Sequence, residues 1–423
     1  MKITALGAAK EVGRSAFLVQ TDSKNLLLDF GVLLRGSEPS FPIHVQPKDI
    51  DAIILSHAHL DHSGATPLFF LSKGVEMYCT SLTLEIADLL IKDFIKISGE
   101  IRGHYLPFEY LELETMVNAT QMVPLEEEFN VGPVRIKLIH AGHIPGSASI
   151  LIEADGKRIL YTGDVNSSDS HLMSAAVTDY GELDFLLTET TYGLNEHPPR
   201  EQVERDFVSY AKEIVERGGT LLVPAFAVGR AQEVACVLYS ANFPYPVAMD
   251  GMALKTNEIL LRHQEFLKDP SLFERTLEHT HLVKDWKERR KILETPSVII
   301  APAGMLVGGS AAFYASELSQ GVRNGIAIVA FQIPGTPGRS LLDKGLTMIN
   351  GKPKKVKSTV RRFDFSSHSG SSQLLEMVRK VRGHPRVAMI HGEEIQSSGF
   401  AKQVEEKLGL QTLVPEPGDV IQI

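Results

Sequence analysis

The chain has 423 residues, of which 43% are hydrophobic and 22% charged, a composition that excludes intrinsic disorder and provides enough chain for two buried domains. The net charge of −9 is unevenly distributed along the chain. Residues 1–193 hold 14 Lys and Arg against 26 Asp and Glu (−12), whereas residues 194–423 hold 29 Lys and Arg against 26 Asp and Glu (+3). A polyanionic partner is therefore expected to bind the second part. Only two cysteines, Cys79 and Cys236, occur, and no apolar run approaches the length of a membrane-spanning helix; this disfavours a disulfide framework, secretion and a membrane span, and favours a cytoplasmic location.

The chain up to about Thr190 contains short apolar runs separated by turns, which predict β-strands. These runs are NLLLDFG (25–31), DAIILSH (51–57), RIKLIH (135–140), ASILIEA (148–154) and KRILYTGD (157–164). One segment after Ser81, LTLEIADLLIKDFIKI, instead has apolar residues at helical spacing and is predicted to be a helix. Two β-sheets with outer helices fit this mixture.

From about residue 200 the pattern changes to alternating helices and strands, which predicts a parallel sheet covered by helices. The pattern begins with a helix in 201–219, a strand in 220–226 and a helix in 229–241, and it repeats in SVIIAPAG (297–304) and GIAIVAFQ (325–332). After Phe363 come a helix in 371–383, a strand in 386–392 and a final helix that ends at Leu408. The segment IPGTPGRS (333–340) is expected to be an exposed loop.

The strongest functional signal is SHAHLDHSG (56–64), which places His57, His59, Asp61 and His62 directly after a predicted strand. Imidazole and carboxylate groups are the ligands that zinc and similar divalent metals prefer. Side chains at positions i and i+2 of an extended segment share a face, so His57 and His59 can hold one ion. The turn that follows lets Asp61 and His62 face a second ion. The alternative is a solvated polar loop, but four ligand types in six positions at a strand end favour a metal site.

This motif resembles the metallo-β-lactamase superfamily, and further signatures occur in the superfamily's order: LLLDFG with Asp29, HAGHIPGSA (140–148) and YTGD (161–164). The resemblance implies that His57, His59 and His143 surround one zinc ion. It implies that Asp61 and His62 hold the other, with Asp164 as the bridge. His140 is a rival of His143, and the A-G-H-x-x-G pattern favours His143. The resemblance gives Asp29 the role of orienting a ligand from behind.

Three later segments resemble the β-CASP nuclease branch: LLTETTYG with Glu189, FDFSSHSG with His368 and AMIHGE with His391. Two stretches between them, VPAFAVGRAQE and APAGMLVGGS, are similar to the branch's inserted domain. The implied fold is α/β, a metallo-β-lactamase αββα sandwich with an inserted β-CASP domain built on a parallel sheet with flanking helices. The expected divisions are 1–193 and 359–423 for the sandwich and 194–358 for the insertion.

The resemblance implies a ribonuclease that uses two Zn²⁺ ions per chain, with Mn²⁺ as a substitute, to hydrolyse phosphodiester bonds of single-stranded RNA in RNA processing or decay. It allows cleavage as an endonuclease, a 5′–3′ exonuclease or both, and assembly as a homodimer or in an RNA-processing complex. Asp61 would orient or deprotonate the nucleophile, His368 would donate a proton to the leaving oxygen, and Glu189 would hold and polarise His368. His391 would bind the second zinc. A non-catalytic scaffold subunit, a DNA-directed nuclease and a small-substrate hydrolase of the same superfamily are the alternatives.

Contacts to substrate phosphates require cationic or hydrogen-bonding groups, and Arg230, Ser310 and Ser369 are the candidates. Ser310 stands where many relatives have Arg. The stretch KPKKVKSTVRR (352–362) has six basic residues and no acid, which predicts either a rail for the RNA backbone or a solvated loop and strand edge. The cluster KDWKERRK (284–291) contains two acids and is expected to be an exposed helix face.

Overall fold

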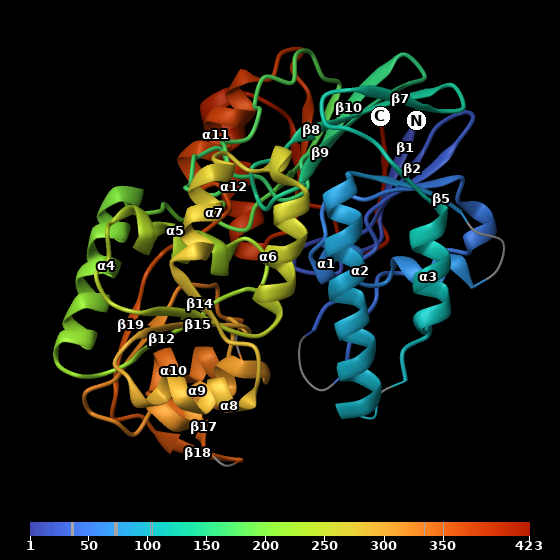
Figure 1. Cartoon of the computed structure of the whole chain (residues 1–423). Coiled ribbons are helices and arrows are strands. Elements are labelled where there is room, and N and C mark those ends of the chain that lie inside the picture. Colours follow the sequence, from blue (N-terminus) through green and yellow to red (C-terminus); the bar gives the residue numbers. More distant parts are fainter. Residues whose placement is uncertain (35–37, 72–74, 102, 104, 334, 350) are drawn as a thin grey trace. The chain divides into compact units, whose positions relative to one another are not determined.

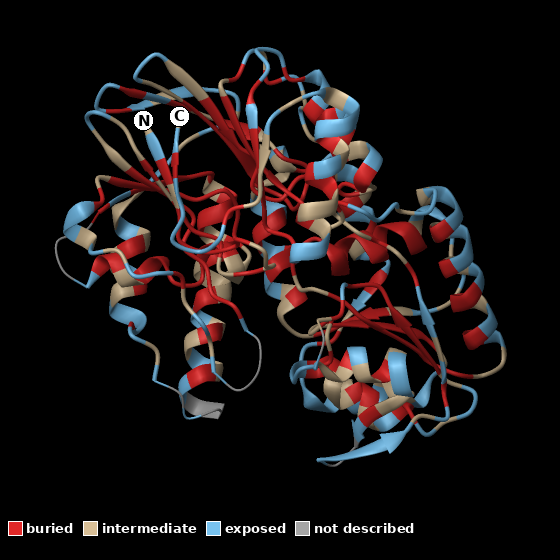
Figure 2. Cartoon of the chain, turned by 180° about the vertical axis from the view of Figure 1, so that it is seen from behind, coloured by how far each residue is buried: buried red, intermediate tan, exposed pale blue. Residues whose placement is uncertain are grey.

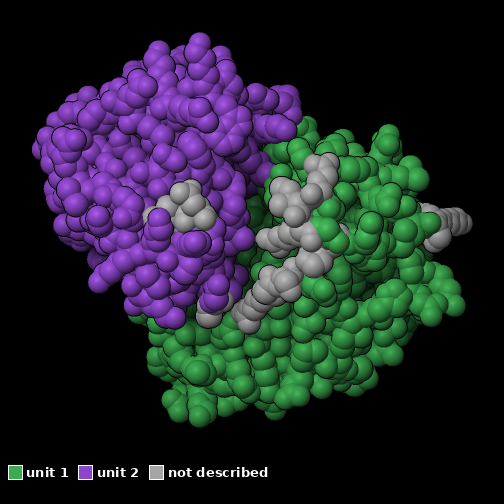
Figure 3. Space-filling view, turned by 90° about the horizontal axis from the view of Figure 1, so that it is seen from below, with its two compact units in different colours: residues 1–169, 175–196, 367–423 green, residues 170–174, 197–366 purple. Residues whose placement is uncertain are grey.

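The computed structural model describes residues 1–34, 38–71, 75–101, 103, 105–333, 335–349 and 351–423. The chain forms two compact units, shown in green and purple in Figure 3. Unit 1 contains residues 1–169, 175–196 and 367–423, and unit 2 contains residues 170–174 and 197–366. The order of the elements along the chain can be followed in Figure 1. Unit 1 is therefore assembled from segments on both sides of the insertion.

Unit 1 contains two seven-stranded sheets. The first has the strand order β22-β1-β2-β3-β4-β5-β6, with β22 (Val420–Gln422), β1 (Lys2–Ala5), β2 (Phe17–Gln20), β3 (Asn25–Leu28), β4 (Ala52–Ile54), β5 (Glu76–Cys79) and β6 (Thr120–Met122). The second has the order β21-β20-β11-β10-β9-β8-β7, with β21 (Thr412–Leu413), β20 (Arg386–Ile390), β11 (Phe185–Glu189), β10 (Lys157–Tyr161), β9 (Ala148–Ala154), β8 (Val134–His140) and β7 (Glu128–Val131). β20 pairs in parallel with β11, although the whole insertion lies between Glu189 and Arg386 in the sequence.

The two sheets bury alternate side chains against a common core, which includes Ile54 from the first sheet and Ile150 and Leu187 from the second. Figure 2 shows this buried zone in red along both sheets. The opposite face of the second sheet packs against α11 (Ser371–Lys380) and α12 (Glu394–Leu408) through residues such as Leu374 and Phe400. Helices α2 (Ser81–Lys96) and α3 (Tyr110–Ala119) contact the first sheet at β6 and β5. The predicted αββα sandwich is confirmed.

Unit 2 is built on a six-stranded sheet in which every paired strand is parallel. Its order is β14-β13-β15-β12-β16-β19, with β14 (Thr280–Leu282), β13 (Val247–Met249), β15 (Val298–Ala301), β12 (Leu221–Pro224), β16 (Gly325–Ile328) and β19 (Thr359–Arg362). The central strands are apolar on both faces, because one face packs on a core with Phe207 and Val234 and the other on a core with Tyr314 and Leu341. The predicted parallel sheet is confirmed.

Helices and a small hairpin complete the two units. The longer helices of unit 2 are α4 (Arg200–Glu216), α5 (Arg230–Ser240), α6 (Met252–Arg262), α7 (Pro270–Glu278), α8 (Trp286–Lys291), α9 (Gly309–Leu318) and α10 (Pro337–Lys344). The hairpin joins β17 (Leu346–Ile349) to β18 (Lys352–Lys355) in antiparallel register. In unit 1, the short helix α1 (Leu60–Ser63) follows the motif after β4.

Two sequence expectations need correction. Residues 359–362, expected to begin the return to the sandwich, form β19 and pair in parallel with β16, so the return begins at Ser367. The expected loop 333–340 is partly helical, because Pro337 starts α10 and Thr336 caps it by accepting a hydrogen bond from the Arg339 N–H. A cap residue followed by Pro is a helix start signal, which the Gly and Pro content of the segment obscured. Pro334 lies outside the described residues.

Candidate metal centre

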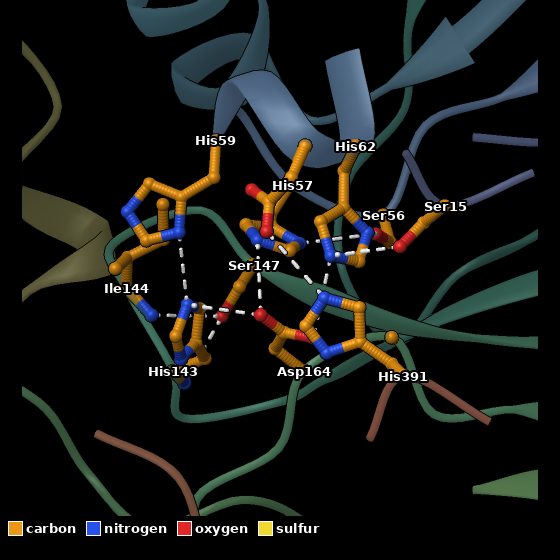
Figure 4. Close-up of polar contacts among 12 residues, drawn as sticks. Ser15, Ser56, His57, His59, His62, His143, Ile144, Ser147, Asp164 and His391 are labelled. Carbon is orange, nitrogen blue, oxygen red and sulfur yellow. Dashed lines mark hydrogen bonds and ion pairs between the residues drawn. The ribbon is translucent and has the colours of Figure 1, made fainter. Parts of the chain in front are cut away.

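The predicted ligands lie in unit 1, where strands of the two sheets end. His57 and His59 follow β4 (Ala52–Ile54), Asp164 follows β10 (Lys157–Tyr161), and His391 follows β20 (Arg386–Ile390). His143 lies in the loop between β8 and β9. The predicted strands at 51–57 and 157–164 end earlier than expected, at Ile54 and Tyr161, so their last residues leave the sheet and turn toward the centre. Figure 4 shows these side chains converging from separate elements.

The structure brings the seven predicted ligands into two groups. In each group the ligand atoms lie within 4.8 Å of one another, the first consisting of His57, His59, His143 and Asp164 and the second of Asp61, His62 and His391. Each group offers imidazole and carboxylate donors from several elements, as zinc sites do. Glu189 also lies within the same distance of Asp164 and His391. The alternative of a solvated polar loop does not fit, because His57 and His62 are buried.

Asp164 connects the two groups through its two carboxylate oxygens. Its Oδ2 lies 3.6 Å from His57 Nε2 and 3.5 Å from His143 Nε2. Its Oδ1 lies 3.3 Å from His62 Nε2 and 3.2 Å from His391 Nδ1. One carboxylate that presents a different oxygen to each group has the geometry of a bridging ligand between two cations.

The protonation of the first group suits metal binding. Burial lowers the pKa of His57 and His143 well below the usual value, and it lowers the pKa of His59 to about 4. The neighbouring imidazoles add to this effect for His57, because two positive rings cannot share the site. At neutral pH these three rings are therefore neutral and keep a lone pair for a cation.

His62 shows the opposite shift. Burial lowers its pKa, but the carboxylates of Asp164 and Asp29 outweigh burial and hold the pKa well above the usual value. Desolvation raises the pKa of Asp61, but the neighbouring His391 and the charge of His62 outweigh desolvation and hold this pKa below its usual value. This half of the centre stabilises a positive charge, which a bound cation can supply.

Asp29 contacts the Nδ1 atom of His62. Its Oδ2 lies 2.7 Å from His62 Nδ1 and accepts hydrogen bonds from Ser56 Oγ at 2.6 Å and Tyr161 Oη at 2.7 Å. The Ser56 N–H donates to Oδ1 at 2.7 Å. With Nδ1 bound to Asp29, His62 keeps Nε2 for the centre. These roles of Ser56 and Tyr161 are not predicted from the sequence, although Tyr161 lies within the YTGD signature.

His143 is fixed by the segment that returns from the insertion. Its Nδ1 donates to the Ser367 carbonyl at 2.8 Å, so Nε2 faces the centre, 3.1 Å from His59 Nδ1. His140 ends β8 outside both groups, so the structure favours His143 of the two rivals. The Ser367 contact cannot be predicted from the sequence, because every residue type has a backbone carbonyl.

His368 lies beside the centre and is held by Glu189. His368 Nδ1 lies 2.8 Å from Glu189 Oε1, and His368 Nε2 lies 3.9 Å from Asp164 Oδ2. Burial lowers the pKa of His368, but the charges of Glu189 and Asp164 outweigh burial and raise it to about 9. Glu189 is itself fixed, because it accepts hydrogen bonds from the N–H groups of Val165 at 2.9 Å and Thr191 at 3.2 Å.

The residues present fit a pair of divalent cations. Within the described part of the chain, His57 Nε2, Asp164 Oδ1 and His391 Nε2 are buried and make no hydrogen bond. Buried polar atoms without hydrogen bonds are costly, and cations bound at the two groups would give all three atoms a partner. His391 adopts a left-handed backbone conformation (φ 45°), held by its N–H donating to Ala8 O at 2.8 Å. Such strain at a ligand is characteristic of functional sites.

The three predicted phosphate-binding residues are divided between the two units. Ser369 is buried in unit 1, where its Oγ accepts a hydrogen bond from the Ser167 N–H at 2.9 Å. Arg230 begins α5 and Ser310 lies in the first turn of α9, both in unit 2. The Ser310 hydroxyl donates to Pro302 O at 3.1 Å. These serine hydroxyls therefore already have partners within the protein.

Comparisons with known families agree with the architecture. The pattern of the metallo-beta-lactamase superfamily matches residues 9–214, the Beta-Casp domain matches residues 231–341, and the Zn-dependent metallo-hydrolase RNA specificity domain matches residues 353–415. A solved structure, that of a protein of unknown function from Enterococcus faecalis V583, has the same fold at 16% identity, with a TM-score of 0.61 over 100% of this chain and 99% of that chain.

Several curated proteins are similar over the whole chain. RNase aCSPSF2 of Saccharolobus solfataricus is 38% identical over 421 residues, which are 99% of this chain and 84% of that protein. Probable RNase MJ4 of Methanocaldococcus jannaschii is 35% identical over 433 residues and 100% of both chains. Transcription termination factor FttA of Pyrococcus abyssi is 34% identical over 463 residues, covering 100% of this chain and 71% of that protein. The resemblance inferred from the signature motifs is thus confirmed, and the chain belongs to the metallo-β-lactamase superfamily, in the branch that carries Beta-Casp and RNA specificity domains.

Proposed function

We propose that this protein is a metal-dependent ribonuclease that uses two zinc ions to hydrolyse phosphodiester bonds of single-stranded RNA in RNA processing or decay. The observation that carries the proposal is the carboxylate of Asp164, whose two oxygens face two separate groups of ligands. The match to an RNA specificity domain and the similarity to proteins named as RNases support RNA as the substrate.

Bound at such a centre, two zinc ions would lower the pKa of water toward neutrality and withdraw charge from the scissile phosphate. Mn²⁺ is the proposed substitute. His57, His59 and His143 would hold one ion, Asp61, His62 and His391 the other, and Asp164 both. The neutral rings of the first group need not lose a proton before they bind.

Two residues act on protons in this proposal. Asp61 is 30% exposed, whereas Asp164 is almost fully buried, so Asp61 can reach a water molecule entering from solvent and orient it or accept its proton. His368 is 18% exposed and is protonated at neutral pH, because its pKa is raised to about 9. With Nδ1 bound to Glu189, His368 donates from Nε2 to the leaving oxygen.

The alternatives predict different measurements. A non-catalytic scaffold would bind RNA without cleaving it. The scaffold alternative is disfavoured because all seven ligand positions carry ligand-type side chains, which lie close together within their groups. A DNA-directed nuclease would cleave single-stranded DNA in preference to RNA.

None of the helices in the described part of the chain is long and apolar enough to cross a membrane. We place the activity in the cytoplasm, with a second copy of the chain or an RNA-processing complex as the proposed protein partners.

The deciding experiment incubates the purified protein with end-labelled single-stranded RNA and DNA, with and without a chelator, while zinc per chain is measured. We expect RNA cleavage that chelation stops and added zinc restores. Fragments of intermediate length would identify internal cleavage, and mononucleotides released from the 5′ end would identify exonucleolytic trimming. RNA left intact by the zinc-loaded protein would contradict the proposal.

A further inference from the structure

The β17–β18 hairpin and the strand β19 form a basic strip on unit 2. Residues 352–362 contain six basic side chains and no acidic one, namely Lys352, Lys354, Lys355, Lys357, Arg361 and Arg362, which we call the basic strip. All six are exposed. Figure 2 shows β18 as exposed along its whole length, and Figure 1 shows the hairpin at the periphery of unit 2.

The lysines of the basic strip differ from Arg361 in their contacts. Arg361 lies 3.3 Å from Glu213 and stacks on Tyr210, with its guanidinium carbon 4.5 Å from the ring centroid. Among the described residues, Lys352, Lys354, Lys355 and Lys357 have no carboxylate within ion-pair distance. Three of these four lie within β18, so their positive charges repel one another and favour an anionic partner.

The backbone beneath these lysines is well supported. Lys355 pairs with Leu346 and Lys352 with Ile349 across the hairpin. The Lys355 carbonyl accepts a hydrogen bond from Gln320 Nε2 at 2.9 Å, and the Lys357 N–H donates to Ser319 O at 2.8 Å. The backbone that carries the lysines is therefore held by hydrogen bonds, and only the lysine side chains need to lose conformational freedom when a partner binds.

The composition of the strip indicates which part of a nucleic acid it fits. Residues 344–362 contain no Phe, Tyr or Trp, so the strip itself has no aromatic side chain on which bases could stack. Lysine ammonium groups are point charges that bind phosphates without reading base edges. We propose that the basic strip binds the sugar–phosphate backbone of single-stranded RNA, independently of base sequence. This inference rests on the proposed function and extends it, because it assigns RNA a contact surface outside the metal centre.

The test measures how salt weakens RNA binding. The variant Lys352→Ala/Lys354→Ala/Lys355→Ala is made in the full-length chain together with His368→Ala, which slows cleavage during the measurement. Each phosphate neutralised on a single strand contributes about 0.7 to the slope of log affinity against log salt, so three lost contacts lower the slope by about 2. The RNA is longer than the ~16 nucleotides that a single-strand-binding domain covers, and two unrelated sequences are compared.

A matched control removes the same charge elsewhere on unit 2. Lys284, Lys287 and Lys291 are exposed in and beside α8, where Asp285 and Glu288 are interspersed, so Lys284→Ala/Lys287→Ala/Lys291→Ala is expected to leave the salt slope unchanged. Zinc content and the midpoint of thermal unfolding establish that both variants are folded.

The outcomes separate this inference from the proposed function. A slope that falls only in the strip variant, equally for both RNA sequences, supports the inference. An unchanged slope, or an equal fall in the α8 control, overturns it. The proposed function is tested separately, by RNA cleavage with the wild-type chain. A wild-type protein that binds RNA through the strip without cutting it would contradict the proposed function and leave this inference standing.

Discussion

His368 Nδ1 lies 2.8 Å from Glu189 Oε1, and this carboxylate has no exposed surface. The pair joins two segments that precede and follow the inserted unit in the sequence, since Glu189 ends β11 and His368 follows the return at Ser367. Because Glu189 also accepts two backbone N–H groups, it cannot turn away from the imidazole without leaving these donors unpaired. The carboxylate therefore sets both the orientation of His368 and its affinity for a proton.

Replacing Glu189 with Gln should move the alkaline limit of RNA cleavage to lower pH. A proton donor with a pKa of about 9 remains active until the pH rises through that value. Gln keeps the shape of the side chain but removes the negative charge, so the pKa of His368 falls and the rate begins to decline at a pH lower by about 1–3 units. The measurement is the pH profile of kcat.

His368→Ala is the matched variant for this test. It should reduce kcat by about 10²–10⁴-fold, the contribution of a general acid, while zinc content stays unchanged because His368 is in neither ligand group. Loss of zinc from His368→Ala would show that this residue is a ligand, and an unshifted profile in Glu189→Gln would exclude the proposed role of Glu189.

Replacing Asp164 with Asn should weaken both cation sites at once. Each oxygen of the carboxylate faces a different ligand group, so the amide removes a negative charge from both. We expect zinc per chain and RNA cleavage to fall together, as measured by elemental analysis and a cleavage assay. The comparison is His59→Ala, which belongs only to the first group and should leave the second ion bound. Full zinc occupancy in Asp164→Asn would contradict the bridging arrangement.

Replacing Asp29 with Asn should lower zinc affinity without removing a ligand. Asp29 fixes His62 through a contact of 2.7 Å to Nδ1, and loss of such an orienting carboxylate costs about 10–100-fold in metal affinity. Competition with a chromophoric chelator measures this affinity. Tyr161→Phe removes only one donor to Asp29 and should have a smaller effect. Equal affinity in Asp29→Asn and the wild type would show that His62 is oriented by other contacts.

Replacing Arg289 with Ala should destabilise unit 2. The Arg289 guanidinium donates to Asp250 at 2.6 and 2.7 Å, and Asp250 is only 1% exposed. Removing one partner leaves a buried carboxylate whose remaining side-chain donor is Tyr314 at 2.8 Å, at a cost of about 3 kcal/mol in the free energy of unfolding. Denaturant titration measures the loss. Arg290→Ala, a substitution at the neighbouring position, is the control, and equal stability of the two variants would contradict the importance of the buried pair.

The sequence allowed the fold and the metal centre to be predicted because the ligands occur in compact motifs at strand ends. His57 and His59 stand out by their spacing after an apolar run. For His143, Asp164 and His391, the resemblance to the superfamily is what implies that they are ligands. The support behind these ligands was harder to predict. Ser367 acts through its carbonyl, which every residue type possesses, and Tyr161 acts through a contact with Asp29 that only the folded chain creates.

The boundary of the insertion was also hard to predict, for a different physical reason. β19 is exposed and basic, and therefore lacks the apolar run by which the other parallel strands were recognised. Its assignment to unit 2 depends on pairing with β16, from which α10 and the β17–β18 hairpin separate it in the sequence. The periodicity of residues within a short segment does not predict a strand pairing between segments that lie far apart in the sequence.

The position of β20 between β11 and β21 has a consequence for biosynthesis. An inner strand of the second sheet, and with it His391, is made only after the whole insertion has been translated. Until the segment after Ser367 emerges from the ribosome, the nascent polypeptide lacks both His368 and His391 and cannot complete the centre. The full set of proposed ligands is therefore present only when synthesis of the chain is nearly finished.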